Sequence, residues 1–126
     1  RGIRNSNPGN IRWDGVTQWD GMVGQDAQGF IIFESVEYGI RAMARILKSY
    51  HRREIYTLES IIHTWAPPSE NETGSYVKHV SDKLDIAPHW PITEARYPDL
   101  IAAIIHHENG INPYSDALIN RGVSMA

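Results

Sequence analysis

The sequence predicts a mainly helical α+β domain in which a small N-terminal β-lobe precedes about five helices. Residues 1–33 are rich in Gly, Asn and Asp and contain only short apolar pieces, whereas from Ser35 onward apolar residues recur at helical spacing. A chain of 126 residues is long enough for one core, so we expect residues 1–126 to form a single domain. Two lobes imply a cleft between them, and clefts are where ligands bind.

Caps, breakers and periodicity predict the individual elements. The apolar run Phe30–Phe33 is typical of a short strand, and residues 1–33 are expected to hold two or three of these. Ser35 is a suitable N-cap for a helix that continues to about Arg53. Four further helices are expected. The second helix begins after a Thr57 cap and stops at Pro67–Pro68, and the third begins after a Thr73 cap and continues through Leu84. The fourth runs from Pro98 to Asn109 and ends at Gly110, and the fifth runs from Pro113 to Arg121.

Composition argues against several classes of protein. The net charge of −3 provides no global basic field, so no nucleic-acid partner is expected. No apolar run approaches the roughly 18 residues that span a bilayer, and no signal-peptide pattern opens the chain, so membrane insertion is not expected. The absence of Cys excludes disulfides and thiolate metal sites. Whether Arg1 is the natural start stays open.

Glu108 is the principal candidate for catalysis. The helix that ends at Asn109 is apolar on one side, and Glu108 lies four residues after Ile104 and three after Ile105, on the same face. The negative end of the helix dipole and partial burial both favour the protonated form of this side chain. A glycosidase uses a protonated carboxylic acid to protonate its leaving oxygen. An exposed Glu in the last helical turn is the alternative interpretation of the pattern alone.

The run from Leu100 to Gly110, Leu-Ile-Ala-Ala-Ile-Ile-His-His-Glu-Asn-Gly, resembles a helix of goose-type lysozymes and lytic transglycosylases. In those families an Ala/Ile-rich helix presents the catalytic Glu. The resemblance therefore implies a lysozyme-like, two-lobed fold with Glu108 as the catalytic acid. Asn109 is a departure, because those families usually have Ser at this position.

The segment from Asn5 to Asp14, Asn-Ser-Asn-Pro-Gly-Asn-Ile-Arg-Trp-Asp, resembles the strand entry of bacterial glucosaminidases and, more loosely, a strand of goose-type enzymes. In those proteins the segment lines the floor of the cleft. The Asn/Gly turn would let backbone N–H groups face a ligand, although such turns are most often structural. The substrate-binding residues predicted for this segment are Asn7, Asn10, Arg12 and Trp13.

A second carboxylate is expected only if the enzyme is a hydrolase. Retaining and inverting glycosidases use two carboxylates, whereas a lytic transglycosylase needs one because the sugar's own hydroxyl attacks. Asp14 occupies the place where goose-type enzymes carry an acidic residue thought to position water, and Asp26 is the alternative. Either Asp can also be an ordinary turn residue. The sequence leaves hydrolase and lytic transglycosylase open.

The segment from Trp65 to Val80 resembles the Glu-Thr-x-x-Tyr-Val-x-x-Val helix entry that closes the sugar cleft in soluble lytic transglycosylases. A structural interpretation also exists, in which Thr73 caps the helix and Tyr76 packs in the core. Tyr76 is predicted either to contact substrate or to orient Glu108. The substrate-binding residues predicted here are Trp65, Glu70, Asn71, Thr73 and Tyr76.

The order of these segments is unusual, because in ordinary lysozyme-like enzymes the Glu helix precedes the cleft strand. A circular permutation would explain the order, and it is sterically simple when the chain ends are close. The whole chain also resembles small phage and prophage proteins that share Asn-Pro-Gly-Asn-Ile-Arg and Trp-Ala-Pro-Pro-x-Glu-Asn-x-Thr, which implies a role in lysis or cell entry.

The expected function is cleavage of peptidoglycan between N-acetylmuramic acid and N-acetylglucosamine by acid catalysis, without a cofactor. The expected partner is a glycan strand of peptidoglycan. The protein is expected to act as a monomer or as part of a phage particle. Its expected location is the virion or the host periplasm and cell wall. The alternative is a non-catalytic virion structural or sugar-binding module. A metal hydrolase is disfavoured, since adjacent helical residues such as His106 and His107 point about 100° apart and no His-Glu-x-x-His occurs.

Overall fold

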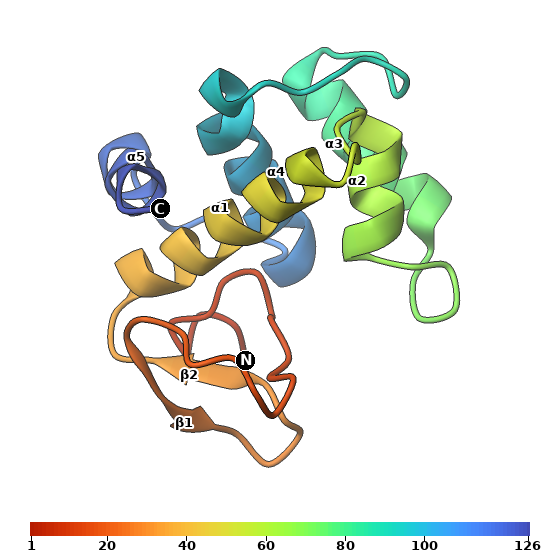
Figure 1. Ribbon diagram of the computed structural model, residues 1–126. Helices are drawn as coiled ribbons and strands as arrows, with labels where there is room; N and C mark the ends of the chain where they lie inside the picture. The colour runs from red at the N-terminus through yellow and green to blue at the C-terminus, as the bar shows by residue number, and fades with distance from the viewer.

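The computed structural model describes residues 1–126 and begins with the β-lobe (Figure 1). Strand β1 (Met22–Gln25) pairs antiparallel with β2 (Ile31–Phe33), and Met22 lies opposite Phe33. An isolated bridge between Arg12 and Phe30 holds the N-terminal segment against this hairpin. The expectation of short strands within residues 1–33 is therefore confirmed.

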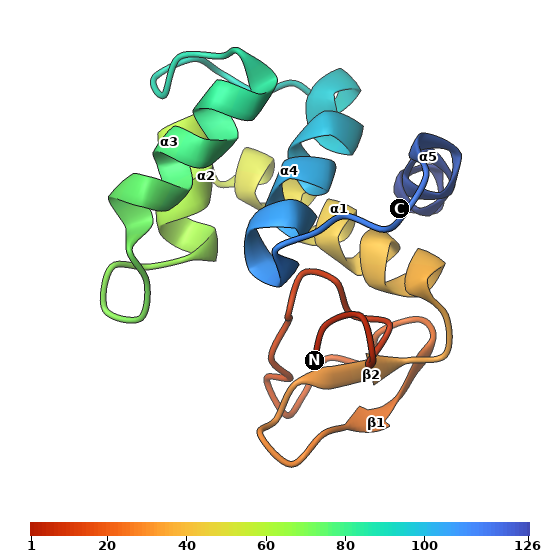
Figure 2. The same cartoon turned by 180° about the vertical axis from the view of Figure 1, so that it is seen from behind.

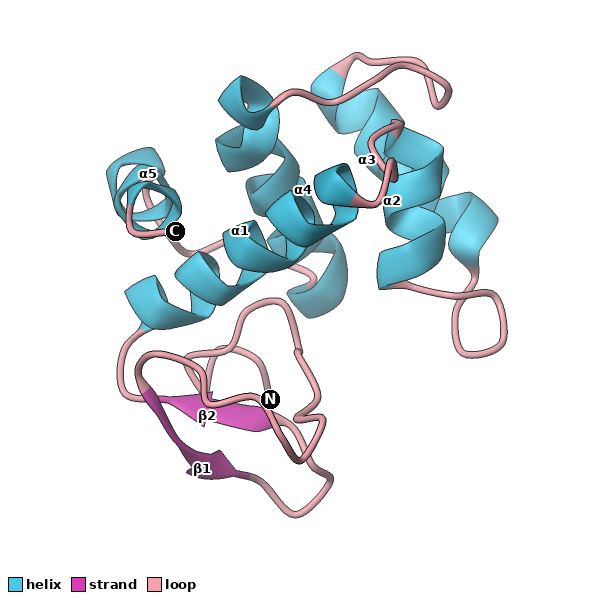
Figure 3. Ribbon diagram, in the orientation of Figure 1, coloured by secondary structure: helices cyan, strands magenta, loops and turns pink.

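The remainder of the chain is helical (Figure 3), and the prediction of a mainly helical α+β domain is confirmed. Ser35 and Thr57 are the N-caps of the first two helices, and Gly110 ends the fourth in the left-handed conformation with φ 77°, as expected. None of the helices combines the length and apolar character that crossing a membrane requires. The helical elements are α1 (Val36–Arg52), α2 (Leu58–Trp65), α3 (Thr73–Leu84), the 3₁₀ turn η1 (Glu94–Arg96), α4 (Tyr97–Asn109) and α5 (Asp116–Ser124).

Three helix starts differ from the prediction. Helix α3 is capped by Glu72 instead of Thr73, because the Thr73 hydroxyl is buried and donates to the carbonyl of Ala66 at 2.7 Å. Helix α4 begins one residue before Pro98, directly after η1. Helix α5 begins at Asp116 instead of Pro113, because the Ser115 hydroxyl accepts from a backbone N–H and caps it there.

Helix α1 joins the two lobes. Its Ala42 packs with Ile31 and Phe33 of the β-lobe, whereas Met43 and Leu47 belong to the main helical core. Gly39 brings the N-terminal loop close to α1, because a Cβ there would collide with the carbonyl of Ser6. The segment Gly39–Met43 lies within α1, and all of its residues except Arg41 are buried.

Helix α4 crosses the helical lobe with one face buried. Leu100, Ile101, Ile104 and Ile105 are fully buried in the main core, while the last turn reaches the surface between the lobes. Seen from both sides, this C-terminal end of α4 lies between the N-terminal loop and the loop that joins α2 to α3 (Figures 1 and 2). The fold thus places Glu108, in the last turn of α4, between these two loops.

Candidate functional site

A cavity of about 460 Å³ lies between the β-lobe and the helical lobe. The β-lobe contributes Arg1, Gly9, Asn10, Ile11, Arg12 and Phe30. The helical lobe contributes Ile46, Tyr50, Trp65, Ala66, Glu70, Asn71 and Glu108. The volume is within the range of sites for small organic ligands, and its lining mixes aromatic, amide and charged groups. Six of the predicted site residues meet here, namely Asn10, Arg12, Trp65, Glu70, Asn71 and Glu108.

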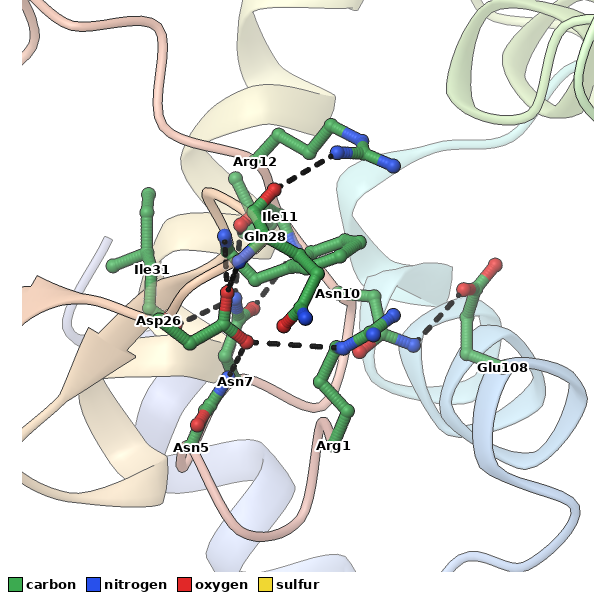
Figure 4. Close-up of polar contacts among 11 residues, drawn as sticks. Arg1, Asn5, Asn7, Asn10, Ile11, Arg12, Asp26, Gln28, Ile31 and Glu108 are labelled. Atoms are coloured by element: carbon green, nitrogen blue, oxygen red, sulfur yellow. Dashed lines mark hydrogen bonds and ion pairs between the residues drawn. The ribbon is translucent and has the colours of Figure 1, made fainter.

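Both carboxylate oxygens of Glu108 accept hydrogen bonds. The Tyr76 hydroxyl donates to Oε2 at 2.8 Å. The Asn10 amide donates to Oε1 at 3.2 Å, and Figure 4 shows this second contact. The Asn10 contact crosses 98 positions of the chain and links the β-lobe to the end of α4. The carboxylate is therefore held in one place by groups from two other segments.

Tyr76 does not line the cavity. It is only 1% exposed, and its ring stacks on that of His107 with 3.7 Å between the centroids. Burial, together with the negative charge and hydrogen bond of Glu108, raises the pKa of Tyr76 far above its usual value. The hydroxyl thus keeps its proton and acts as a donor to Glu108, which agrees with the predicted orienting role more than with a sugar contact.

The side chain of Asn10 carries both a hydrogen-bond donor and an acceptor beside Glu108. Its backbone is left-handed with φ 51°, a conformation that Asn tolerates better than most residues. Its Oδ1 is buried without a hydrogen-bond partner. Rotation of the amide by 180° would turn this oxygen toward Glu108, where it could accept the proton of the neutral acid. Asn10 can therefore serve either protonation state of Glu108.

Asn7 holds the N-terminal loop closed and does not reach the cavity. It is completely buried, and its amide donates to the carbonyls of Ile11 and Ile31, both at 2.9 Å. Its Oδ1 accepts from the N–H of Ile11 at 3.0 Å. Asn7 was predicted to bind substrate, but every hydrogen bond given by its side chain goes to the protein backbone.

Asn109 attaches the same loop to α4. Its amide donates to the carbonyl of Pro8 at 2.8 Å and to that of Ile105 at 3.0 Å. The residue that departs from the usual Ser thus connects the helix of Glu108 to the loop of Asn10. A shorter Ser side chain could not be expected to make both contacts.

Two guanidinium groups approach the same aromatic ring in the β-lobe wall. Those of Arg1 and Arg12 each lie 4.4 Å from the centroid of Phe30. Arg12 donates to the carbonyl of Gln28 at 3.2 Å. The β-lobe side of the cavity is therefore cationic, while Glu70 and Glu108 make the helical side acidic.

Neither predicted second carboxylate lines the cavity. Asp14 lies on an exposed turn, where it accepts from the Thr17 hydroxyl at 2.5 Å and from the N–H groups of Thr17 and Val16. These bonds, with that of the Thr17 hydroxyl first, lower the pKa of Asp14. Its side chain stabilises a local turn, which is the structural interpretation of this residue.

The side chain of Asp26 also forms its hydrogen bonds within the β-lobe (Figure 4). It accepts from the N–H groups of Gln28 and Phe30 and from the Asn5 amide, and Arg1 lies 3.7 Å away. Burial opposes its ionisation, but the hydrogen bonds, with that of Phe30 first, and the charge of Arg1 outweigh it and lower the pKa of Asp26. Its carboxylate holds the turn before β2.

Two other predicted residues lie outside the cavity. Trp13 packs against the β-lobe core, and its indole N–H donates to the carbonyl of Thr17 at 3.0 Å. Thr73 is buried and bonded to Ala66, so it anchors the loop that carries Glu70. Sequence reasoning did not identify Arg1, Phe30 and Tyr50 as cavity residues. Tyr50 follows the helical period and Phe30 lies in a strand pattern, and neither pattern distinguishes a residue that lines a cavity from one that packs in the core.

Three histidines of α3 and α4, His79, His106 and His107, contact one another beside Tyr76. The Nδ1 atoms of His79 and His107 are 2.8 Å apart, so one ring must donate to the other, and His106 meets His79 edge to face. No group of three or more His, Asp or Glu side chains in the structure has an arrangement that could hold a metal ion. The pair instead connects α3 to α4 beside Tyr76.

The fold and site together define a small, two-lobed α+β protein whose cavity presents a doubly hydrogen-bonded Glu at a helix end. No protein family model matches the chain. It is 40% identical to "Protein P5" of Pseudoalteromonas phage PM2 over 126 aligned positions, which cover 97% of this chain and 79% of the phage protein. The chain therefore belongs to the same family as this phage protein.

Proposed function

We propose that this protein cleaves the glycan strand of peptidoglycan between N-acetylmuramic acid and N-acetylglucosamine, with Glu108 as the catalytic acid. The observation that carries the proposal is the position of Glu108 at the edge of a cavity, held by Tyr76 and Asn10. A fixed carboxyl group beside a cavity with Trp65 and Phe30 is the arrangement expected for acid catalysis on a sugar.

The chemistry requires Glu108 to enter the reaction protonated. It donates this proton to the glycosidic oxygen while the bond from that oxygen to C1 breaks, and positive charge develops on the ring. The Tyr76 donor and an acceptor from the rotated Asn10 amide would keep the acid oriented, and the carboxylate formed would regain both donors. Acid catalysis with substrate distortion needs no cofactor.

The proposed setting is phage lysis or cell entry. Membership in the family of a phage protein supports a phage origin, and a virion or a host cell wall is where such an enzyme would meet peptidoglycan. The lysozyme-like and permuted character of the fold is part of this proposal. The support for it is the juxtaposition of the Asn7–Arg12 segment, the Tyr76 helix and Glu108, which are the segments that carry the family resemblance.

The test is release of muropeptides from purified Gram-negative sacculi by the wild type, Glu108→Gln and Glu59→Gln. We expect Glu108→Gln to lower the rate by on the order of 10²-fold or more, because Gln cannot donate the proton. The exposed Glu59 of α2 is the matched control and should leave the rate unchanged. If the wild type binds sacculi but releases nothing, the protein is a non-catalytic cell-wall-binding module.

A further inference from the structure

The cavity contains a second carboxylate besides Glu108, and it belongs to Glu70. Asp14 and Asp26 are both engaged in turns of the β-lobe and line no part of the cavity. Glu70 is exposed to solvent, lines the cavity together with Glu108, and forms no side-chain hydrogen bond or ion pair. Among the acidic residues of the chain, only these two line this cavity.

Glu70 enters from a different element than Glu108. It lies in the loop between α2 and α3. In both views the C-terminal end of α4 lies between this loop and the N-terminal loop (Figures 1 and 2). Its own N–H donates to the carbonyl of Pro67 at 3.0 Å, and the Asn71 amide donates to the same carbonyl. The loop therefore has a defined turn at Glu70, although the side chain is free.

The contacts of the two carboxylates differ in a way that suits different tasks. Glu108 is partly buried and touches a Tyr hydroxyl and an amide, which orient it for a directed proton transfer. Glu70 faces water and has no partner in the protein that would compete with a water molecule. Both oxygens of its side chain are therefore available to accept hydrogen bonds from a water molecule in the cavity.

We propose that Glu70 is the general base of the site, which makes the enzyme an inverting hydrolase; this inference rests on the proposed function. Glu108 gives its proton to the leaving oxygen as the C1–O bond breaks. Glu70 removes a proton from a water molecule whose oxygen forms the new bond to C1. The net change is addition of one water to the glycosidic bond, and proton exchange with solvent restores both side chains.

The test compares Glu70→Gln with the wild type and with Glu72→Gln. Glu72 ends the same loop, is exposed and does not line the cavity, so it is the matched control. We expect Glu70→Gln to lower kcat on sacculi by on the order of 10²- to 10⁴-fold, while binding to the glycan is kept. Glu72→Gln should retain the wild-type rate.

Product analysis and rescue separate a general base from a residue that only shapes the loop. The wild type should release a hydrated reducing end whose initial anomer, read by proton NMR, is inverted relative to the β-linked substrate. Azide should partly restore cleavage by Glu70→Gln and yield an inverted glycosyl azide, because this anion needs no base. The same addition should not restore Glu108→Gln.

Several outcomes overturn the inference and leave the proposed function standing. Full activity of Glu70→Gln, a retained anomer, or a 1,6-anhydro product from the wild type would each show that Glu70 is not the base. The anhydro product identifies a lytic transglycosylase with Glu108 alone. No cleavage by the wild type removes the proposed function itself, and the inference with it.

Discussion

The two loops that border the cavity are constructed in opposite ways. In the N-terminal loop from Asn7 to Arg12, the Asn7 side chain forms hydrogen bonds with the backbone of Ile11. The Asn109 side chain of α4 forms a hydrogen bond with the carbonyl of Pro8 in the same loop. The loop from Pro67 to Glu72 has an exposed surface from Pro68 onward, and its side-chain bond within the loop is that of Asn71. One loop is part of the core, and the other is attached to the core only at its ends.

This difference suits two requirements of the proposed reaction. A proton donor must be held in a fixed geometry, and Asn10 on the N-terminal loop touches Glu108 directly. A glycan strand must also enter and leave the cavity, which requires that one of the bordering loops can move aside at a small cost in free energy. The loop of Glu70 has the fewer contacts, so we expect it to open first.

Replacing Asn7 should have the largest effect on stability. Asn7→Ala removes the partners of three backbone groups of Ile11 and Ile31, so we expect the free energy of unfolding to fall by about 3 kcal/mol. Urea denaturation measures this loss. Asn120→Ala, at an exposed position of α5, should change it by less than about 0.5 kcal/mol. A loss for Asn7→Ala no larger than that of the control would contradict a rigid N-terminal loop.

Removing the anchor of the second loop should cost less. Thr73→Val keeps the shape of the side chain but leaves the carbonyl of Ala66 without its buried donor, so we expect a loss of about 1 kcal/mol in the same assay. The control is Thr64→Val, because the Thr64 hydroxyl donates to a backbone carbonyl at an exposed site. If Thr73→Val lowers the free energy of unfolding as much as Asn7→Ala does, the two loops are equally integrated into the fold and do not differ in the way described.

The helical framework could be predicted from the sequence because its signals are local. Apolar spacing placed α4, Thr57 and Ser35 placed the N-terminal ends of two helices, and Gly110 placed the end of α4. The start of α5 was wrong because Pro113 and Ser115 are both suitable helix-start residues, and only the cap formed by Ser115 decides between them.

The composition of the cavity could be predicted only in part, because it depends on contacts between distant segments. Asn10 and Glu108 are far apart in sequence, and their approach was expected only from the resemblance of both segments to one class of enzyme. The pattern could not show that Asp14 and Asp26 are occupied by their own turns, since free and bonded carboxylates look alike in a sequence. Arg1 and Phe30 line the cavity through packing that no local period encodes.

A smaller, pH-dependent difference between the two borders follows from the histidines. The six His residues all lie after position 50, so all of them belong to the helical lobe. Two of them, His79 on α3 and His107 on α4, are in direct contact. Burial lowers the pKa of both, for His79 with the nearby charges of His106 and Lys83, and for His107 with that of His79 against an opposing effect of Glu108. The helical side is therefore the one that responds to mild acid.

The sign of this response follows from proton uptake. A His whose pKa is lowered in the folded state binds its proton more weakly than the unfolded chain does, so the free energy of unfolding is highest above about pH 6.5 and declines as the pH falls below it. Because both rings are partly exposed, we expect the smallest of the three stability effects. Urea denaturation between pH 7.5 and pH 5 should show a shallower decline for His79→Gln than for the wild type, while the exposed His63→Gln should follow the wild type. Equal declines in all three would mean that the contact between α3 and α4 titrates no differently from the unfolded chain, and that the two borders of the cavity differ in hydrogen bonding alone.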